Sequence, residues 1–203
     1  KKLYCPACYE KYNLKQARST LRWSLATIPL SLLFLWLAPG DPIARIWIVL
    51  PVVIFFNILV IPLHELGHVL VGRLMNFRIF TVIIGIGQPV LKARRFGIQW
   101  ELRQIPLGGA TLMGSPDGQH YRLRRFMATL AGPAVHAVLC ALSLFYYLTP
   151  LAWFAPPWIN VLVSCFLWVN LVLLVINLLP HKVGSAYGLI GSDGMQMIET
   201  LSM

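Results

Sequence analysis

Charge is scarce in this sequence, and acidic residues are the scarcest. Asp and Glu together number seven among 203 residues, while 58% of the residues are hydrophobic and 12% are charged. An average soluble domain carries about a quarter charged residues. A surface so poor in charge could not be kept hydrated, so lipid is the better candidate for the solvent around most of this chain.

The net charge of +10 taken alone would suggest a nucleic-acid partner. Lys and Arg, however, fall almost entirely in two blocks, 1–22 and 73–125, which flank apolar runs. No recognisable nucleic-acid-binding module accompanies them, so we predict that this protein does not bind nucleic acid. The two blocks indicate membrane topology first, and a surface for anionic lipid second.

Apolar stretches predict four membrane spans, near residues 23–40, 46–75, 126–148 and 158–179. Six Lys and Arg precede the first span, and one lies between the first two. Nine lie in 73–125, from the end of the second span to the third, and none lies between the last two. The positive-inside rule then places both termini and the 73–125 loop in the cytosol. The N-terminal segment 1–22 is thus cytosolic, and 23–203 form the membrane domain.

Two of the four cysteines form a short motif in the N-terminal segment. Cys5 and Cys8 make Cys-Pro-Ala-Cys, which supplies half the ligands of a zinc ribbon. Two interpretations stay open: a half-site for a second metal ion that needs further ligands, or a pair of free thiols. Cys140 and Cys165 lie in apolar stretches, where cysteine behaves as a small buried hydrophobe.

A metal-binding pattern ends the second predicted span. His64–His68 read His-Glu-Leu-Gly-His, and positions i and i+4 share one face of a helix, so both imidazoles can bind one zinc ion. Glu65 would stand beside the metal as the general base for its water. Ionisable side chains in an apolar helix are costly in lipid unless they are paired or ligating, which favours a metal site over a chance match.

Two histidines leave a catalytic zinc site one protein ligand short. By the predicted topology, residues 177–193 lie at the same membrane depth as the His64–His68 motif. Asp193, in Gly-Ser-Asp-Gly, is one candidate for the third ligand, although it could be an ordinary turn residue. His181 is the competing candidate, because it is closer to the end of the fourth span.

Four elements together resemble the site-2 protease family of intramembrane zinc metalloproteases, peptidase family M50, over most of residues 45–203. His64–His68 resemble the family's HExxH, and 131–136 (Ala-Gly-Pro-Ala-Val-His) resemble its Gly-Pro-x-x-Asn element. Asn177-Leu-Leu-Pro with Asp193-Gly194 resembles its Asn-x-x-Pro…Asp-Gly element, and 104–109 resemble its Pro-Leu-Gly-Gly hairpin at the membrane surface.

This resemblance implies an α-helical polytopic membrane protein: a three-helix metalloprotease core with one additional N-terminal helix and a small β-hairpin insertion. It implies Zn²⁺ held by His64, His68 and Asp193. His136 stands where the family usually has Asn. His136 and Asn177 are therefore candidates for contacts with the substrate or with an oxyanion.

The insertion is expected over residues 79–112. Strands rich in β-branched residues flank a Phe96-Gly97 turn, which is typical of a hairpin. The hairpin could simply cap the site, or 98–105 could be an exposed edge that pairs with an unwound substrate segment. The candidate substrate contacts are Ile105, Pro106, Leu107, Gly108 and Gly109.

The expected function is that of a zinc metalloendopeptidase that cuts membrane-spanning or membrane-associated proteins, single-pass proteins above all. We expect it in a prokaryotic cytoplasmic membrane. The alternative is a catalytically weak or inactive relative that binds membrane partners without cleaving them. Such a relative would have lost Glu65 or a histidine ligand, and neither is lost here. A carrier would need ligands spread across the bilayer, whereas these residues share one depth.

The predicted topology can be tested with single cysteines placed at Thr149 and Gln119 in a chain whose four native cysteines are replaced. Because the positive-inside rule puts Thr149 outside and Gln119 in the cytosol, a membrane-impermeant maleimide should label them from opposite sides. Labelling of both positions from one side would contradict the four-span arrangement.

Overall fold

The structure is a computed structural model that describes residues 42–114, 118, 120–185 and 188–202, together with isolated positions between 15 and 33. Cys5, Cys8 and nearly all of the predicted span 23–40 lie outside the described residues. The second-metal hypothesis and the first predicted span, 23–40, therefore stay predictions.

Three described helices are long and apolar enough to cross a membrane. They are α2 (Pro42–Leu74), in which the apolar span is Pro51–Leu74, α3 (Tyr121–Leu148) and α5 (Pro157–Leu178). The short helix α4 (Leu151–Phe154) joins α3 to α5, and a proline at the first position of α5 suits a helix start. Three of the four predicted spans are confirmed as helices of this length and composition.

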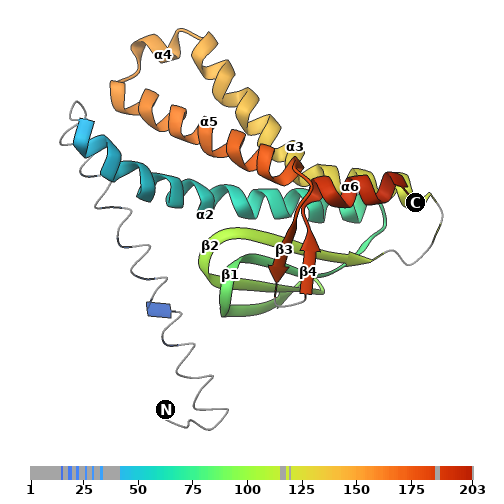
Figure 1. Ribbon diagram of the computed structural model, residues 1–203. Helices are drawn as coiled ribbons and strands as arrows, with labels where there is room; N and C mark the ends of the chain where they lie inside the picture. Colours follow the sequence, from blue (N-terminus) through green and yellow to red (C-terminus); the bar gives the residue numbers. More distant parts are fainter. Residues whose placement is uncertain are drawn as a thin grey trace.

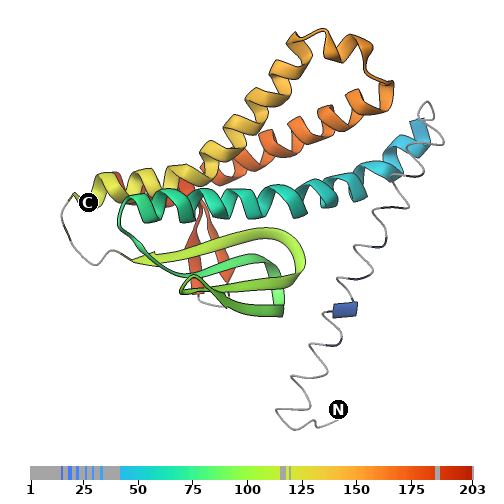
Figure 2. The same cartoon turned by 180° about the vertical axis from the view of Figure 1, so that it is seen from behind.

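The three helices converge toward the C-terminal half of α2 and spread apart at the opposite end (Figures 1 and 2). Helix α2 contacts α3 at Gly67, where an added Cβ would lie 2.8 Å from the carbonyl oxygen of Ala131 and 2.9 Å from Cγ2 of Val135. Small residues allow helix backbones to approach this closely in membranes. The glycine between the two motif histidines is therefore required for packing.

A sheet of two long strands, β1 (Arg78–Arg95) and β2 (Ile98–Gly114), packs against α2 and α3. The strands are antiparallel, and the turn between them has positive φ at Phe96 (54°) and Gly97 (77°), as a type I′ hairpin requires. Val82, Ile98, Val69 of α2 and Ala128 of α3 are part of one buried apolar cluster. The predicted hairpin insertion and its turn are confirmed.

The predicted exposed edge over 98–105 is wrong for its larger part. Residues 98–102 pair with 91–95 on one side, and 99–102 pair with 81–84 on the other. The reason is a reversal of β1 at Gly85 and Gly87, whose positive φ values (93° and 89°) bring the two halves of β1 to opposite sides of β2. Among the described residues, 109–114 pair only with 78–84 and 91–95 pair only with 98–102, so the sheet has one free edge at 109–114 and another at 91–95.

A buried ion pair marks 98–103 as the interior of this sheet. Glu101 is 2% exposed and accepts a hydrogen bond from Arg103 at 3.0 Å. Burial by itself would raise the pKa of Glu101, but Arg103, Lys92 and Gln99 lower it below its usual value. The carboxylate therefore stays charged and paired.

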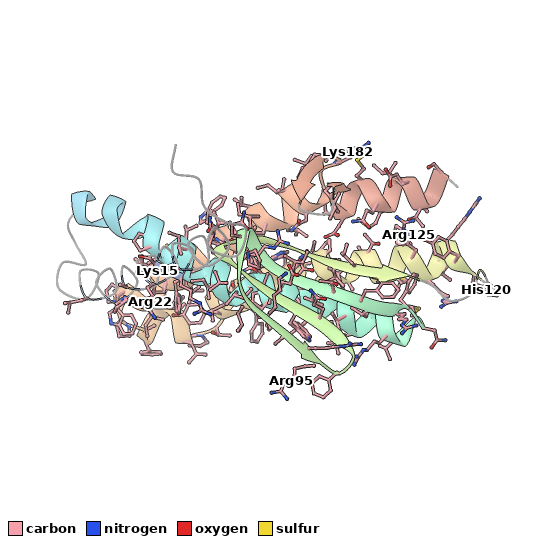
Figure 3. The ribbon with its side chains drawn as sticks, turned by 90° about the horizontal axis from the view of Figure 1, so that it is seen from below. Lys15, Arg22, Arg95, His120, Arg125 and Lys182 are labelled. Carbon is pink, nitrogen blue, oxygen red and sulfur yellow. The ribbon has the colours of Figure 1, made fainter. Side chains whose placement is uncertain are left out.

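The chain ends in elements that the sequence did not predict. After α5, strands β3 (Lys182–Ser185) and β4 (Gly188–Gly191) form a second antiparallel hairpin, followed by helix α6 (Asp193–Ser202). Helix α6 packs on α3 and contacts β4. The labelled side chains of Arg95, at the end of β1, and Lys182, at the start of β3, point outward (Figure 3).

Replacing Gly67 by Ala should loosen the contact between α2 and α3. Because the new Cβ meets backbone at 2.8 Å, we expect destabilisation of about 1–3 kcal/mol, typical of overpacking. Thermal unfolding in detergent measures the effect. Gly118→Ala is the control, since a Cβ there has no neighbour within 4 Å. Equal midpoints for the two variants would contradict the close packing.

Candidate metal centre

The two histidines of α2 present ring nitrogens to a common point. His64 and His68 are buried one turn apart, and their Nε2 atoms are 3.1 Å from each other. Nδ1 of His68 donates a hydrogen bond to the carbonyl oxygen of Ala128 at 2.8 Å. This bond leaves Nε2 of the neutral ring as the lone-pair donor, the arrangement that metal-ligating histidines use.

Asp193, the first residue of α6, faces both histidines. Its Oδ2 is 3.2 Å from Nε2 of His64, and its Oδ1 is 3.4 Å from Nε2 of His68. Burial alone would raise the pKa of Asp193, but the contacts with the two imidazoles lower it to about 2. The carboxyl group is therefore ionised at neutral pH.

Ser192 fixes the place of Asp193 despite the long segment that precedes it. The Ser192 hydroxyl donates to the carbonyl oxygen of Leu179 at 2.6 Å, and it accepts hydrogen bonds from the backbone N–H groups of His181 and Met195 at 3.2 and 3.3 Å. It thus ties the end of α5 to the start of α6. These bonds hold Asp193 close to the end of α5 across the intervening β3–β4 hairpin.

The three side chains fit a zinc ion. Ligands about 2.0–2.1 Å from a tetrahedral zinc lie about 3.3 Å apart, close to the observed spacings. Nδ1 of His64 and Oδ2 of Asp193 are buried without an aligned hydrogen-bond partner. A Cβ added to Gly132 would lie 2.6 Å from Nε2 of His64, so the space beside the ligands is open because that residue is glycine. Two imidazoles and a carboxylate are a usual catalytic zinc set.

His181 is not part of this group. Among the described residues, the cluster whose ligand atoms could share one metal ion is His64, His68 and Asp193. His181 is directed elsewhere, since its Nδ1 lies 2.9 Å from the carbonyl oxygen of Leu179. The geometry favours Asp193 among the two candidates for the third ligand.

Glu65 lies beside the three potential ligands without belonging to them. It is 3% exposed, and its Oε2 accepts a hydrogen bond from the Thr111 hydroxyl of β2 at 2.6 Å. Its Oε1 lies so close to the backbone of Gly109 that a Cβ there would overlap it. The Glu65 carboxylate lies next to the potential metal ligands but is hydrogen-bonded to β2. This position suits a general base better than a metal ligand.

A cavity of about 780 Å³ contains these groups, a size typical of ligand sites. Helices α2, α3 and α5, the edge of β2 and the start of α6 all line it. The site residues predicted from the sequence that line this cavity are His64, Glu65, His68, Gly108, Gly109, His136, Asn177, His181 and Asp193.

His136 is buried in α3, and its ring centroid is 4.9 Å from that of His64. Asn170 of α5 donates its Nδ2 to the carbonyl oxygen of Phe166, so its Oδ1 faces Nδ1 of His136 at 3.1 Å. Nδ1 of His136 is then the donor, and Nε2 of the neutral ring can only accept. This arrangement favours a contact with a substrate N–H group over one with an oxyanion.

The sequence missed several residues that build the centre. The Gly-Pro element could have pointed to Gly132. Ser192 could have been found as a helix N-cap, because it directly precedes Asp193. Thr111 and Asn170 had none, because their partners are far away in the chain.

Comparison with known proteins shows the family of this chain. Residues 51–158, more than half of the chain, match peptidase family M50. Three proteins named "putative zinc metalloprotease" are similar over shorter stretches: those of Neisseria meningitidis (31% identical over 103 residues), Campylobacter jejuni (27% over 122) and Thermotoga maritima (29% over 115). The matches cover 44%, 60% and 48% of this chain, but 23%, 30% and 23% of those proteins. The chain therefore spans less than a third of the length of these curated relatives.

The ligand set makes a prediction for zinc binding. The purified protein should hold one zinc ion at this centre, and Asp193→Ala should lose it, because two histidines alone leave the site under-coordinated. His181→Ala, the matched control from the same cavity, should retain the metal. Zinc titration with elemental analysis measures both. The reverse pattern would make His181 the ligand.

Proposed function

The chain belongs to peptidase family M50, and on this basis we propose that it is an intramembrane zinc metalloendopeptidase with Asp193 as the third zinc ligand. The observation that carries the proposal is the convergence of His64, His68 and Asp193 beside the Glu65 carboxylate, in a cavity among three membrane-length helices. The relatives named above support a metalloprotease, while cleavage of a membrane substrate is our own inference.

The proposed reaction assigns one role to each group of side chains. Zinc, when bound, supplies a Lewis acid that lowers the pKa of water and stabilises negative charge on a carbonyl oxygen. Glu65 accepts a proton from that water through its carboxylate, so that the water oxygen can form a bond to the scissile carbonyl carbon. Glu65 then gives the proton to the leaving amine nitrogen as the C–N bond breaks. His64, His68 and Asp193 hold their positions throughout.

We propose a single-pass membrane protein as the substrate. A transmembrane helix hides its peptide bonds within its own hydrogen bonds, so a segment must unwind before it can be cut. The free edge 109–114 of β2 begins beside Glu65 and offers unpaired backbone groups to such a segment. The earlier candidates Ile105 to Gly109 lead into this edge, and their contact with substrate stays a prediction.

The proposed setting is a prokaryotic cytoplasmic membrane with both termini in the cytosol, and the bilayer is a permanent partner. Three apolar helices support an integral membrane protein. The alternative of an inactive relative has no observation in its favour, since Glu65 and the three potential ligands are present and assembled.

Glu65→Gln tests the proposed function most simply. Purified protein in nanodiscs should cleave candidate single-pass substrates, lose activity with a chelator and regain it with added zinc. Glu65→Gln should keep its zinc and lose activity by about 10²–10⁴-fold, the usual contribution of a general base. The control is Glu199→Gln, which removes a carboxylate of α6 outside the cavity lining. Cleavage by Glu65→Gln at the wild-type rate would contradict the assignment.

A separate prediction concerns how the free edge of β2 affects substrate cleavage. Pro at Ala110 or Leu112 disrupts the backbone of this edge, and strand alternation turns both side chains away from α2. Cleavage should fall much more than zinc content. Ala93→Pro on the opposite edge is the control and should cleave normally. Parallel loss of zinc and activity at Ala110 and Leu112 would mean that the edge is only structural.

A further inference from the structure

One face of strand β2 is built around the Glu65 carboxylate. Alternate residues of the strand face α2: Gly109 and Thr111 contact Glu65, and the sulfur of Met113 lies 3.4 Å from the Cβ position of Gly72. Positions 65 and 72 are about two helical turns apart and share one face of α2. The strand therefore docks along this face in a single register.

Gly109 and Thr111 contact different oxygens of the carboxylate. Gly109 lacks a side chain where Oε1 lies, which lets the strand approach the helix. Thr111 then reaches Oε2 with its hydroxyl at 2.6 Å, the length of a charge-assisted hydrogen bond. Together they restrict both the position and the rotation of the carboxyl group.

We propose that Thr111 is the positioning residue for Glu65, an inference that rests on the proposed function. A hydroxyl group carries one donor hydrogen and two acceptor lone pairs. Thr111 can donate to the ionised carboxylate and can accept from the protonated acid. The same contact therefore persists while Glu65 takes a proton from water and returns it to the amine nitrogen, and no rearrangement of the base is needed between the two steps.

This role also connects the base to the substrate. The residue that holds Glu65 lies within the free edge 109–114, where the proposed substrate strand would pair. A segment bound there would lie along the strand that aligns the base. Strand β2 would thus position both the scissile carbonyl and Glu65. This matters because displacing a reacting group by 1 Å can lower the reaction rate by about 10²-fold.

The test compares Thr111→Val, which keeps the shape and removes the hydroxyl, with Thr111→Ser, which keeps the hydroxyl. Thr111→Val should lower kcat by about 10–100-fold, with KM and zinc content at wild-type values, because only the alignment of the base is lost. Thr111→Ser should restore most of the rate. Thr81→Val is the control: it removes a buried hydroxyl from the same sheet outside the cavity lining, and it should behave as wild type.

An infrared measurement examines the contact without any cleavage. The difference spectrum between each variant and its Glu65→Gln counterpart isolates the Glu65 carboxyl band. This band should shift in Thr111→Val and return to the wild-type frequency in Thr111→Ser. An unshifted band, a wild-type kcat in Thr111→Val, or equal impairment of the Val and Ser variants would overturn the proposal. A band that shifts in Thr111→Val, together with a wild-type protein that cleaves no substrate, would contradict the proposed function and leave the contact established.

Discussion

Burying four ionisable side chains among apolar helices has a free-energy cost that determines how this site is built. His64, Glu65, His68 and Asp193 are each at least nine-tenths removed from solvent. Isolated charges in such a place would cost several kcal/mol each. The protein meets this cost by bringing the groups together: the two imidazoles and Asp193 surround a metal-sized space, where a bound cation would satisfy them, and the Thr111 hydroxyl donates to Glu65.

Glycines make this assembly possible because they admit backbone where side chains would not fit. Gly67 brings α3 against α2, Gly132 leaves open the space beside the histidines, and Gly109 brings β2 against Glu65. A fourth, Gly194, lets α6 approach the carbonyl of Leu178, where a Cβ would overlap. Each element that supplies a functional side chain is thus held by a close contact next to that side chain.

The sequence predicted the parts of the centre that depend on local spacing. The i, i+4 relation placed His64 and His68 on one face, and apolar length predicted α2, α3 and α5 as spans. It left Asp193 and His181 as alternatives, because the bonds of Ser192 that close the long hairpin are tertiary. It mistook 98–105 for an edge, because the reversal of β1 at Gly85 and Gly87 cannot be read from alternation alone.

The proposed reaction requires zinc bound by the two imidazoles of α2 and the carboxylate of Asp193. X-ray absorption at the zinc edge tests it most directly, on protein in which Cys5 and Cys8 are replaced by Ser. The predicted result is a bound zinc ion with nitrogen and oxygen neighbours at about 2.0–2.2 Å and the scattering pattern of two imidazoles. Loss of zinc on removing these cysteines, or a sulfur shell at about 2.3 Å, would contradict the account.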